Sequence, residues 1–135
     1  MKNVYIVGAA RTAVGSLGKS LKNISAEDLG SSVISNVLER SKITSNDIDE
    51  VIMGQVLTGG SGQNPARQAS MKSGIPKEKP AFIVNQVCGS GIRSVASAFQ
   101  SIRADDSKIV IAGGQESMSL APVSYTHLTL PTSPK

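Results

Sequence analysis

The chain has 135 residues, of which 39% are hydrophobic and 18% are charged, so it is long enough for one modest domain with a core and is neither disordered nor a coiled coil. The formal net charge of +4 comes from 14 basic and 10 acidic residues, and the aromatic content of 3% gives little support for stacking on nucleic-acid bases. The single cysteine excludes an intramolecular disulfide and a metal site built from several cysteines.

The sequence shows no secretory leader and no long apolar run, which predicts a cytoplasmic protein with no membrane partner. Its basic residues are mostly scattered. One loose basic group is interpreted as solvated surface, and the alternative is a patch that meets anionic phosphates or another subunit. Its members are Arg67, Lys72, Lys77 and Lys79, with Glu78 among them.

The first part of the chain predicts two strands and a helix. Residues 4–7 form a compact apolar run that ends at a glycine, which is typical of a buried strand. Ser25 and Asp28 have the spacing of a capping box, and an amphipathic helix is expected over residues 26–41. A second strand is expected over residues 51–53. The apolar face of the helix is formed by Leu29, Val33, Val37 and Leu38.

The second part of the chain continues the alternation. Asn64 is expected to cap a helix over residues 65–73, which starts with proline and is followed by glycine. Residues 81–84 form a third apolar strand, and apolar groups at helical spacing predict a helix over residues 90–103. Residues 109–112 form the fourth strand.

The order β-α-β-α-β-α-β predicts an α/β fold with a mainly parallel sheet between helices. Ligands of such sheets bind beyond the carboxyl ends of the strands. Cys88 follows the third predicted strand, and residues 113–116 follow the fourth. We therefore expect these two segments to line one crevice.

The segment around Cys88 is the most informative part of the sequence. It places the only cysteine between an apolar strand and the start of a helix, with Gly89 and Gly91 on either side of Ser90. The unpaired N–H groups of a helix N-terminus favour a thiolate, and the glycines leave room for a substrate carbonyl. A lone cysteine is most often a small buried hydrophobe. This setting instead predicts the nucleophile of a covalent acyl-transfer site.

Five collinear segments over residues 1–122 together resemble the N-terminal part of the thiolases, most closely those of the acetyl-CoA acetyltransferase type. Any one segment alone would be a weak signal, whereas five in the same order are specific. The segments are residues 9–15 (AARTAVG), 51–57 (VIMGQVL), 62–68 (GQNPARQ), 85–91 (NQVCGSG) and 112–119 (AGGQESMS).

The resemblance implies an incomplete thiolase-like half-domain and a mechanism. Cys88 would take an acetyl group from acetyl-CoA as a thioester, and its backbone N–H would supply part of an oxyanion hole. A second acetyl-CoA would then attack in a Claisen condensation that gives acetoacetyl-CoA and CoA, with thiolysis as the reverse reaction. The resemblance also implies that acetyl-CoA and CoA are substrate and product rather than cofactors, and that the parent enzyme is a homodimer or homotetramer.

Supporting roles follow from the same resemblance. Asn64 and Arg67 would hold a loop near the subunit contact; the alternatives are a helix cap and a surface charge. Gln115 and Glu116 are interpreted as structural polar anchors behind the nucleophile rather than as acid–base catalysts.

The sequence departs from the family in two ways. The family's Gly-His-Pro, Asn-Glu-Ala and second-cysteine motifs are absent, as are its CoA-gripping loop domain and the last strand of the half-domain. Residues 123–135 resemble a translated sequencing adapter, so we assign the partial domain to residues 1–122 and exclude the rest. His127, the only histidine, falls in this tail and is not interpreted as a partner of the thiol. We therefore expect the 135-residue chain to be inactive alone.

Three other hypotheses remain at this point. The complete protein could instead be a 3-ketoacyl-CoA thiolase of fatty-acid degradation, which would differ from an acetyl-CoA acetyltransferase mainly in regions that this chain lacks. A non-catalytic protein of thiolase fold is disfavoured by the intact Cys88 segment. The hypothesis of a redox sensor is weak, because the chain has no second cysteine that could form a disulfide with an oxidised Cys88.

Overall fold

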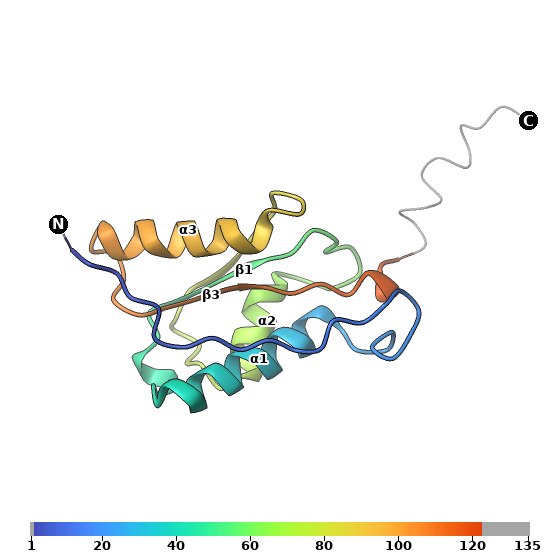
Figure 1. Cartoon of the computed structure of the whole chain (residues 1–135), viewed down its shortest axis with the longest axis horizontal. Coiled ribbons are helices and arrows are strands. Elements are labelled where there is room, and N and C mark those ends of the chain that lie inside the picture. The colour runs from blue at the N-terminus through green and yellow to red at the C-terminus, as the bar shows by residue number, and fades with distance from the viewer. Residues whose placement is uncertain (1, 123–135) are drawn as a thin grey trace, which may run out of the picture.

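Three parallel strands form one open sheet in the order β2-β1-β3 (Figure 1). They are β1 (Glu50–Gly54), β2 (Ala81–Val84) and β3 (Val110–Gly114). The structure is a computed structural model and describes residues 2–122. Val51 pairs with Ala81 on one side and with Ile111 on the other, so the carboxyl ends of all three strands lie at the same edge of the sheet. The parallel arrangement predicted from the sequence is confirmed.

The helices are α1 (Ala26–Ser41), α2 (Pro65–Lys72) and α3 (Ser90–Arg103), with short 3-10 helices η1 (Ser45–Asp47) and η2 (Met118–Leu120). Their ends follow the local sequence signals. The Ser25 hydroxyl accepts from the Asp28 N–H at 3.2 Å, and the Asn64 side-chain oxygen accepts from the Arg67 N–H at 3.1 Å. Gly74 follows α2 with φ +77°, a left-handed conformation that glycine adopts without a steric penalty.

The sheet lies between α3 on one face and α1 with α2 on the other (Figure 1). Alternation along β1, which is buried from residue 51 to residue 54, explains how both faces are filled, because successive side chains point to opposite sides. Val51 and Met53 join a core cluster with residues of α1 and α2, whereas Gly54 faces the start of α3. The cluster consists of Ile34, Leu38, Ile48, Val51, Met53, Ala66, Ala69 and Ile75.

The prediction of a strand at residues 4–7 is wrong. This segment is extended but pairs with no strand among residues 2–122, and Tyr5, Ile6 and Val7 are 74%, 84% and 66% exposed. It lies beside α1, where the Arg40 guanidinium donates to the Ala9 carbonyl at 3.4 Å. An apolar run becomes a strand only when a neighbouring strand takes up its N–H and C=O groups. In the described part of the chain β3 pairs with β1 alone, so its outer edge has no strand partner.

The loose basic group does not form a free patch. Arg67 donates to the carbonyls of Lys79 and Lys77 at 2.8 and 2.6 Å. Lys72 pairs with Asp28 at 2.5 Å, and Lys79 lies 3.8 Å from Asp49. The interpretation as ordinary surface therefore holds for the lysines, while Arg67 fixes a turn. Among residues 2–122, no helix is long and apolar enough to span a membrane.

Asp49 anchors the amino end of β3. Its carboxylate accepts from the N–H groups of Lys108 and Ile109 at 2.8 and 3.0 Å. These donors, that of Ile109 foremost, hold the pKa of the Asp49 carboxyl below its usual range. A lowered pKa in the folded state means that the contribution to stability is present above the unfolded pKa and is lost as the pH falls through the folded value.

Asp49→Asn should lower the free energy of unfolding by about 1 kcal/mol at neutral pH, since a charged acceptor becomes neutral at a side chain that is 35% exposed. The difference should shrink as the pH falls from about 3.9, the pKa of an unfolded aspartate, through the lowered pKa of folded Asp49, because the wild-type carboxyl then also becomes protonated. Urea denaturation over this pH range and at neutral pH measures the difference, with exposed Glu39→Gln as control. A difference that persists in acid would contradict the assignment.

Candidate functional site

Cys88 lies in an exposed loop between β2 and α3, two residues before the helix begins. Residues 85–88 leave β2 and turn at once into the helix, with the Gly89 N–H donating to the Gln86 carbonyl at 3.0 Å. The Cys88 N–H has no protein acceptor among residues 2–122. The thiol therefore stands in the open, beside the unpaired amides and positive end of α3.

Val87 holds the loop in an unusual conformation. Its φ is +50°, in the left-handed region that a β-branched residue rarely occupies. The Asn85 side-chain oxygen accepts from the Val87 N–H at 3.0 Å. The Ser90 hydroxyl accepts from the Gln86 N–H at 2.8 Å and donates to the Val87 carbonyl at 2.6 Å. These bonds fix a strained residue directly before the thiol, and such strain clusters at functional sites.

Gly54 brings the start of α3 onto the sheet. A Cβ on Gly54 would lie 2.4 Å from the Ser90 carbonyl carbon and 2.7 Å from the Gly91 nitrogen. Gly114 at the end of β3 is similarly close, since its Cβ would lie 3.4 Å from Gly91 Cα. Ser94, one turn further along α3, donates to the Gly113 carbonyl at 2.7 Å. The helix that carries the thiol is thus packed directly on the ends of β1 and β3.

Polar side chains join the ends of β1 and β3. The Glu116 carboxylate accepts from the N–H groups of Val56 and Leu57 at 2.8 and 3.2 Å. The buried Gln115 amide donates to Gln55 at 2.9 Å, while its own oxygen has no partner among the described residues. Their interpretation as structural anchors agrees with these contacts. A Cβ on Gly30 would overlap that oxygen, so the glycine in α1 provides the space that the Gln115 side chain occupies.

Asn64 and Arg67 do not reach the thiol loop through any hydrogen bond. Asn64 donates to the Ala81 carbonyl at 2.8 Å and caps α2, and Arg67 binds the turn before β2. Both fix the connection between α2 and β2. The expected role in holding a loop thus has a local structural basis, and contact with another subunit stays a prediction.

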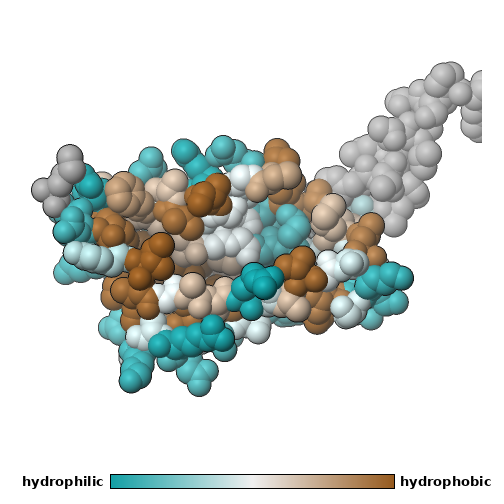
Figure 2. Space-filling view, viewed as in Figure 1, coloured by the Kyte–Doolittle hydropathy of each residue, from teal (hydrophilic) through white to brown (hydrophobic). Residues whose placement is uncertain are grey.

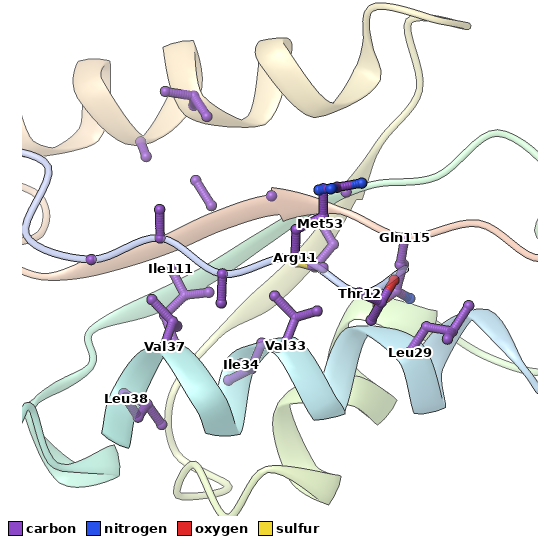
Figure 3. A pocket seen from close by; sticks show the side chains of 18 of the residues that line it. Arg11, Thr12, Leu29, Val33, Ile34, Val37, Leu38, Met53, Ile111 and Gln115 are labelled. Atoms are coloured by element: carbon purple, nitrogen blue, oxygen red, sulfur yellow. The ribbon is translucent and has the colours of Figure 1, made fainter. Parts of the chain in front are cut away.

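A large groove lies on the other side of the strand ends (Figure 3). It encloses about 880 Å³ between the N-terminal segment, α1, α3 and the outer edge of β3, and its lining includes Gln115 and Glu116 but not Cys88. Apolar side chains gather on this face of the molecule (Figure 2). This groove is therefore separate from Cys88, although residues 113–116, which line it, include Gly114 beside Gly91 in the first turn of α3.

Sequence reasoning missed three features of the site. It gave Gly54 no role beyond marking the end of a strand within a matched segment, but the glycine is required by the close approach of α3. The strain at Val87 carries no sequence signal, since valine does not predict a positive φ. Gln55 belonged only to a matched segment, and its buried bond to Gln115 depends on the pairing of β1 with β3.

The structure defines an α/β domain in which three parallel strands lie between helices and an exposed cysteine precedes a helix. The chain belongs to the thiolase family, because the thiolase N-terminal domain matches residues 4–132. It is 57% identical over 122 residues to acetyl-CoA acetyltransferases of Cupriavidus necator and of Escherichia coli K12, covering 90% of this chain and 31% of each relative. The Acat5 thiolase from Ascaris suum in complex with coenzyme A superposes with a TM-score of 0.88 at 43% identity, covering 90% of this chain and 32% of that one. The chain thus spans about a third of the length of the relatives it matches.

Gly54→Ala should destabilise the protein by about 1–3 kcal/mol, because the added methyl group overlaps the backbone at the start of α3. Gly91→Ala is the matched control, since its Cβ would meet nothing within 4 Å, and it should be neutral or slightly stabilising. Chemical denaturation compares the two variants. Equal stability of both would show that the close packing on Gly54 is not required.

Ser90→Ala should cost about 1–2 kcal/mol and open the thiol loop, because it removes the acceptor of the Gln86 N–H from a buried position. Hydrogen–deuterium exchange should show loss of protection at Gln86. Ser94→Ala is the control, since it removes a buried hydroxyl of α3 that binds β3 and not the loop. Unchanged protection of Gln86 in Ser90→Ala would contradict this account.

Proposed function

We propose that the complete protein is an acetyl-CoA acetyltransferase and that Cys88 is its nucleophile. The observation that carries the proposal is the exposed Cys88 thiol beside the amides at the start of α3, in a chain of the thiolase family. The relatives' name and the coenzyme A bound to the Ascaris suum thiolase support acetyl-CoA and CoA as the substrates.

The proposed reaction uses the sulfur twice. The Cys88 thiolate attacks the acetyl carbonyl of acetyl-CoA, a new C–S bond forms, and the C–S bond to CoA breaks as CoA leaves and takes up a proton. The methyl carbanion of a second acetyl-CoA then attacks the acyl-enzyme, which releases the Cys88 thiolate and acetoacetyl-CoA. The free N–H of Cys88 supports a role in binding the carbonyl oxygen as negative charge develops on it.

Gly89, Ser90 and Gly91 support this role in different ways. Ser90 is buried and fixes the loop, while Gly91 has open space beside its Cα, which leaves room for a thioester to approach the sulfur. Gly89 precedes the first residue of α3. Asn64, Arg67, Gln115 and Glu116 act at a distance as structural supports.

We further propose that the active form of the complete protein is a cytoplasmic homodimer or homotetramer. The exposed apolar side chains of α3 support packing against protein outside residues 2–122, since Ile92 is 73% and Phe99 is 48% exposed. We place the group that removes the substrate proton outside these residues, because the family motifs that carry a histidine and a second cysteine are absent from them.

The test is a chimaera in which residues 1–122 replace the matching part of the Escherichia coli enzyme. It should catalyse acetoacetyl-CoA thiolysis, and Cys88→Ala should reduce the rate by about a thousandfold or more. The 135-residue chain alone should show no thiolysis. A folded chimaera without activity, or one that keeps its activity in Cys88→Ala, would refute the proposal.

A further inference from the structure

We propose that Glu116 is a positioning residue for Cys88 and acts through the segment after β1 and through Asn85. This inference rests on the proposed function, since it concerns the same nucleophile. Glu116 does not touch the thiol loop. Its effect is transmitted by a series of hydrogen bonds that connects the end of β3 with the residue before Cys88.

The first step joins β3 to the segment after β1. Both oxygens of the Glu116 carboxylate are used, one by the Val56 N–H at 2.8 Å and the other by the Leu57 N–H at 3.2 Å. Two consecutive backbone donors converge on one charged side chain, which is a strong arrangement in a half-buried position. A glutamine could accept only one of them, because its NH₂ group would face the other donor.

The second step joins that segment to the start of the thiol loop. The Gln55 N–H donates to the Val84 carbonyl at 3.1 Å, and the Asn85 side-chain nitrogen lies 3.4 Å from the Val56 carbonyl. Val56 therefore stands between Glu116, which holds its N–H, and Asn85, which approaches its carbonyl. A shift of Val56 therefore moves the carbonyl that the Asn85 side chain contacts.

The third step reaches the residue before the nucleophile. With its nitrogen directed at Val56, Asn85 presents its oxygen to the Val87 N–H at 3.0 Å. Asn85 holds the N–H of Val87 while Ser90 holds its carbonyl, and together they keep its strained φ of +50°. When Asn85 releases the N–H, part of this restraint is lost and Cys88 moves relative to the amides at the start of α3.

The experiment measures the local field at the sulfur of the full 135-residue chain. Cys88, the only cysteine, is alkylated with neutral iodoacetamide and with anionic iodoacetate, and the ratio of the two rates reports the positive potential near the thiol. Glu116→Asp, which keeps the charge but is too short to reach both amides, should lower the iodoacetate-to-iodoacetamide ratio by about two- to fivefold, the size of a helix-dipole interaction. Asn85→Ala should lower it equally, and the double variant should fall no further, because both act on one path.

Asp49→Asn is the matched control, because Asp49 also holds two consecutive N–H groups but at the amino end of β3, away from the loop. It should leave the ratio unchanged, so a general loss of stability is excluded as the cause. If Glu116→Asp lacks the helical circular dichroism signal, the uncharged change Asn85→Ala carries the test. An unchanged ratio, an equal fall in Asp49→Asn, or additive effects of Glu116 and Asn85 would overturn the proposal. No acyl-CoA is involved, so this outcome is independent of the activity of the chimaera.

Discussion

The site depends on the contact between the start of α3 and the end of β1. At Gly54 the backbone of β1 approaches Ser90 so closely that no side chain fits between them. Because of this contact, the chain must leave β2 and enter α3 within a few residues, in a tight loop that carries Cys88. The strained Val87 and the bonds of Ser90 are consequences of that short connection. An exposed thiol beside helix amides is thus produced by backbone packing rather than by neighbouring charged side chains.

The parallel sheet brings the supporting groups to the same place. The ends of β1, β2 and β3 lie at one edge, so residues that follow different strands can bind one another. Glu116 after β3 holds the segment after β1, and that segment in turn contacts Asn85 after β2. The buried pair of Gln55 and Gln115 adds a second connection between β1 and β3. The expected shared crevice is not observed, because residues 113–116 line the open groove and Cys88 does not.

The groove and the misplaced first strand have a common explanation. Residues 4–7 have the composition of a buried strand, yet in residues 2–122 the outer edge of β3 has no partner and the segment beside it remains exposed. Local composition shows that these residues suit a strand. Whether they form one depends on a neighbour that supplies hydrogen bonds and cover. The error thus arises from pairing, which is a property of the assembled sheet.

The sequence alone determined the parallel arrangement of β1, β2 and β3, the bounds of α1, α3 and β2, and the position of Cys88 before α3, since these depend on local periodicity, capping residues and a recognisable motif. The roles of Gly54, Val87, Gln55 and Glu116 were decided only by the tertiary structure. Each depends on an atom more than two residues away in the chain or on a backbone angle that its own residue type does not favour. Spacing along a chain reports helices and strands, whereas close approach between them exists only after the sheet and helices have packed.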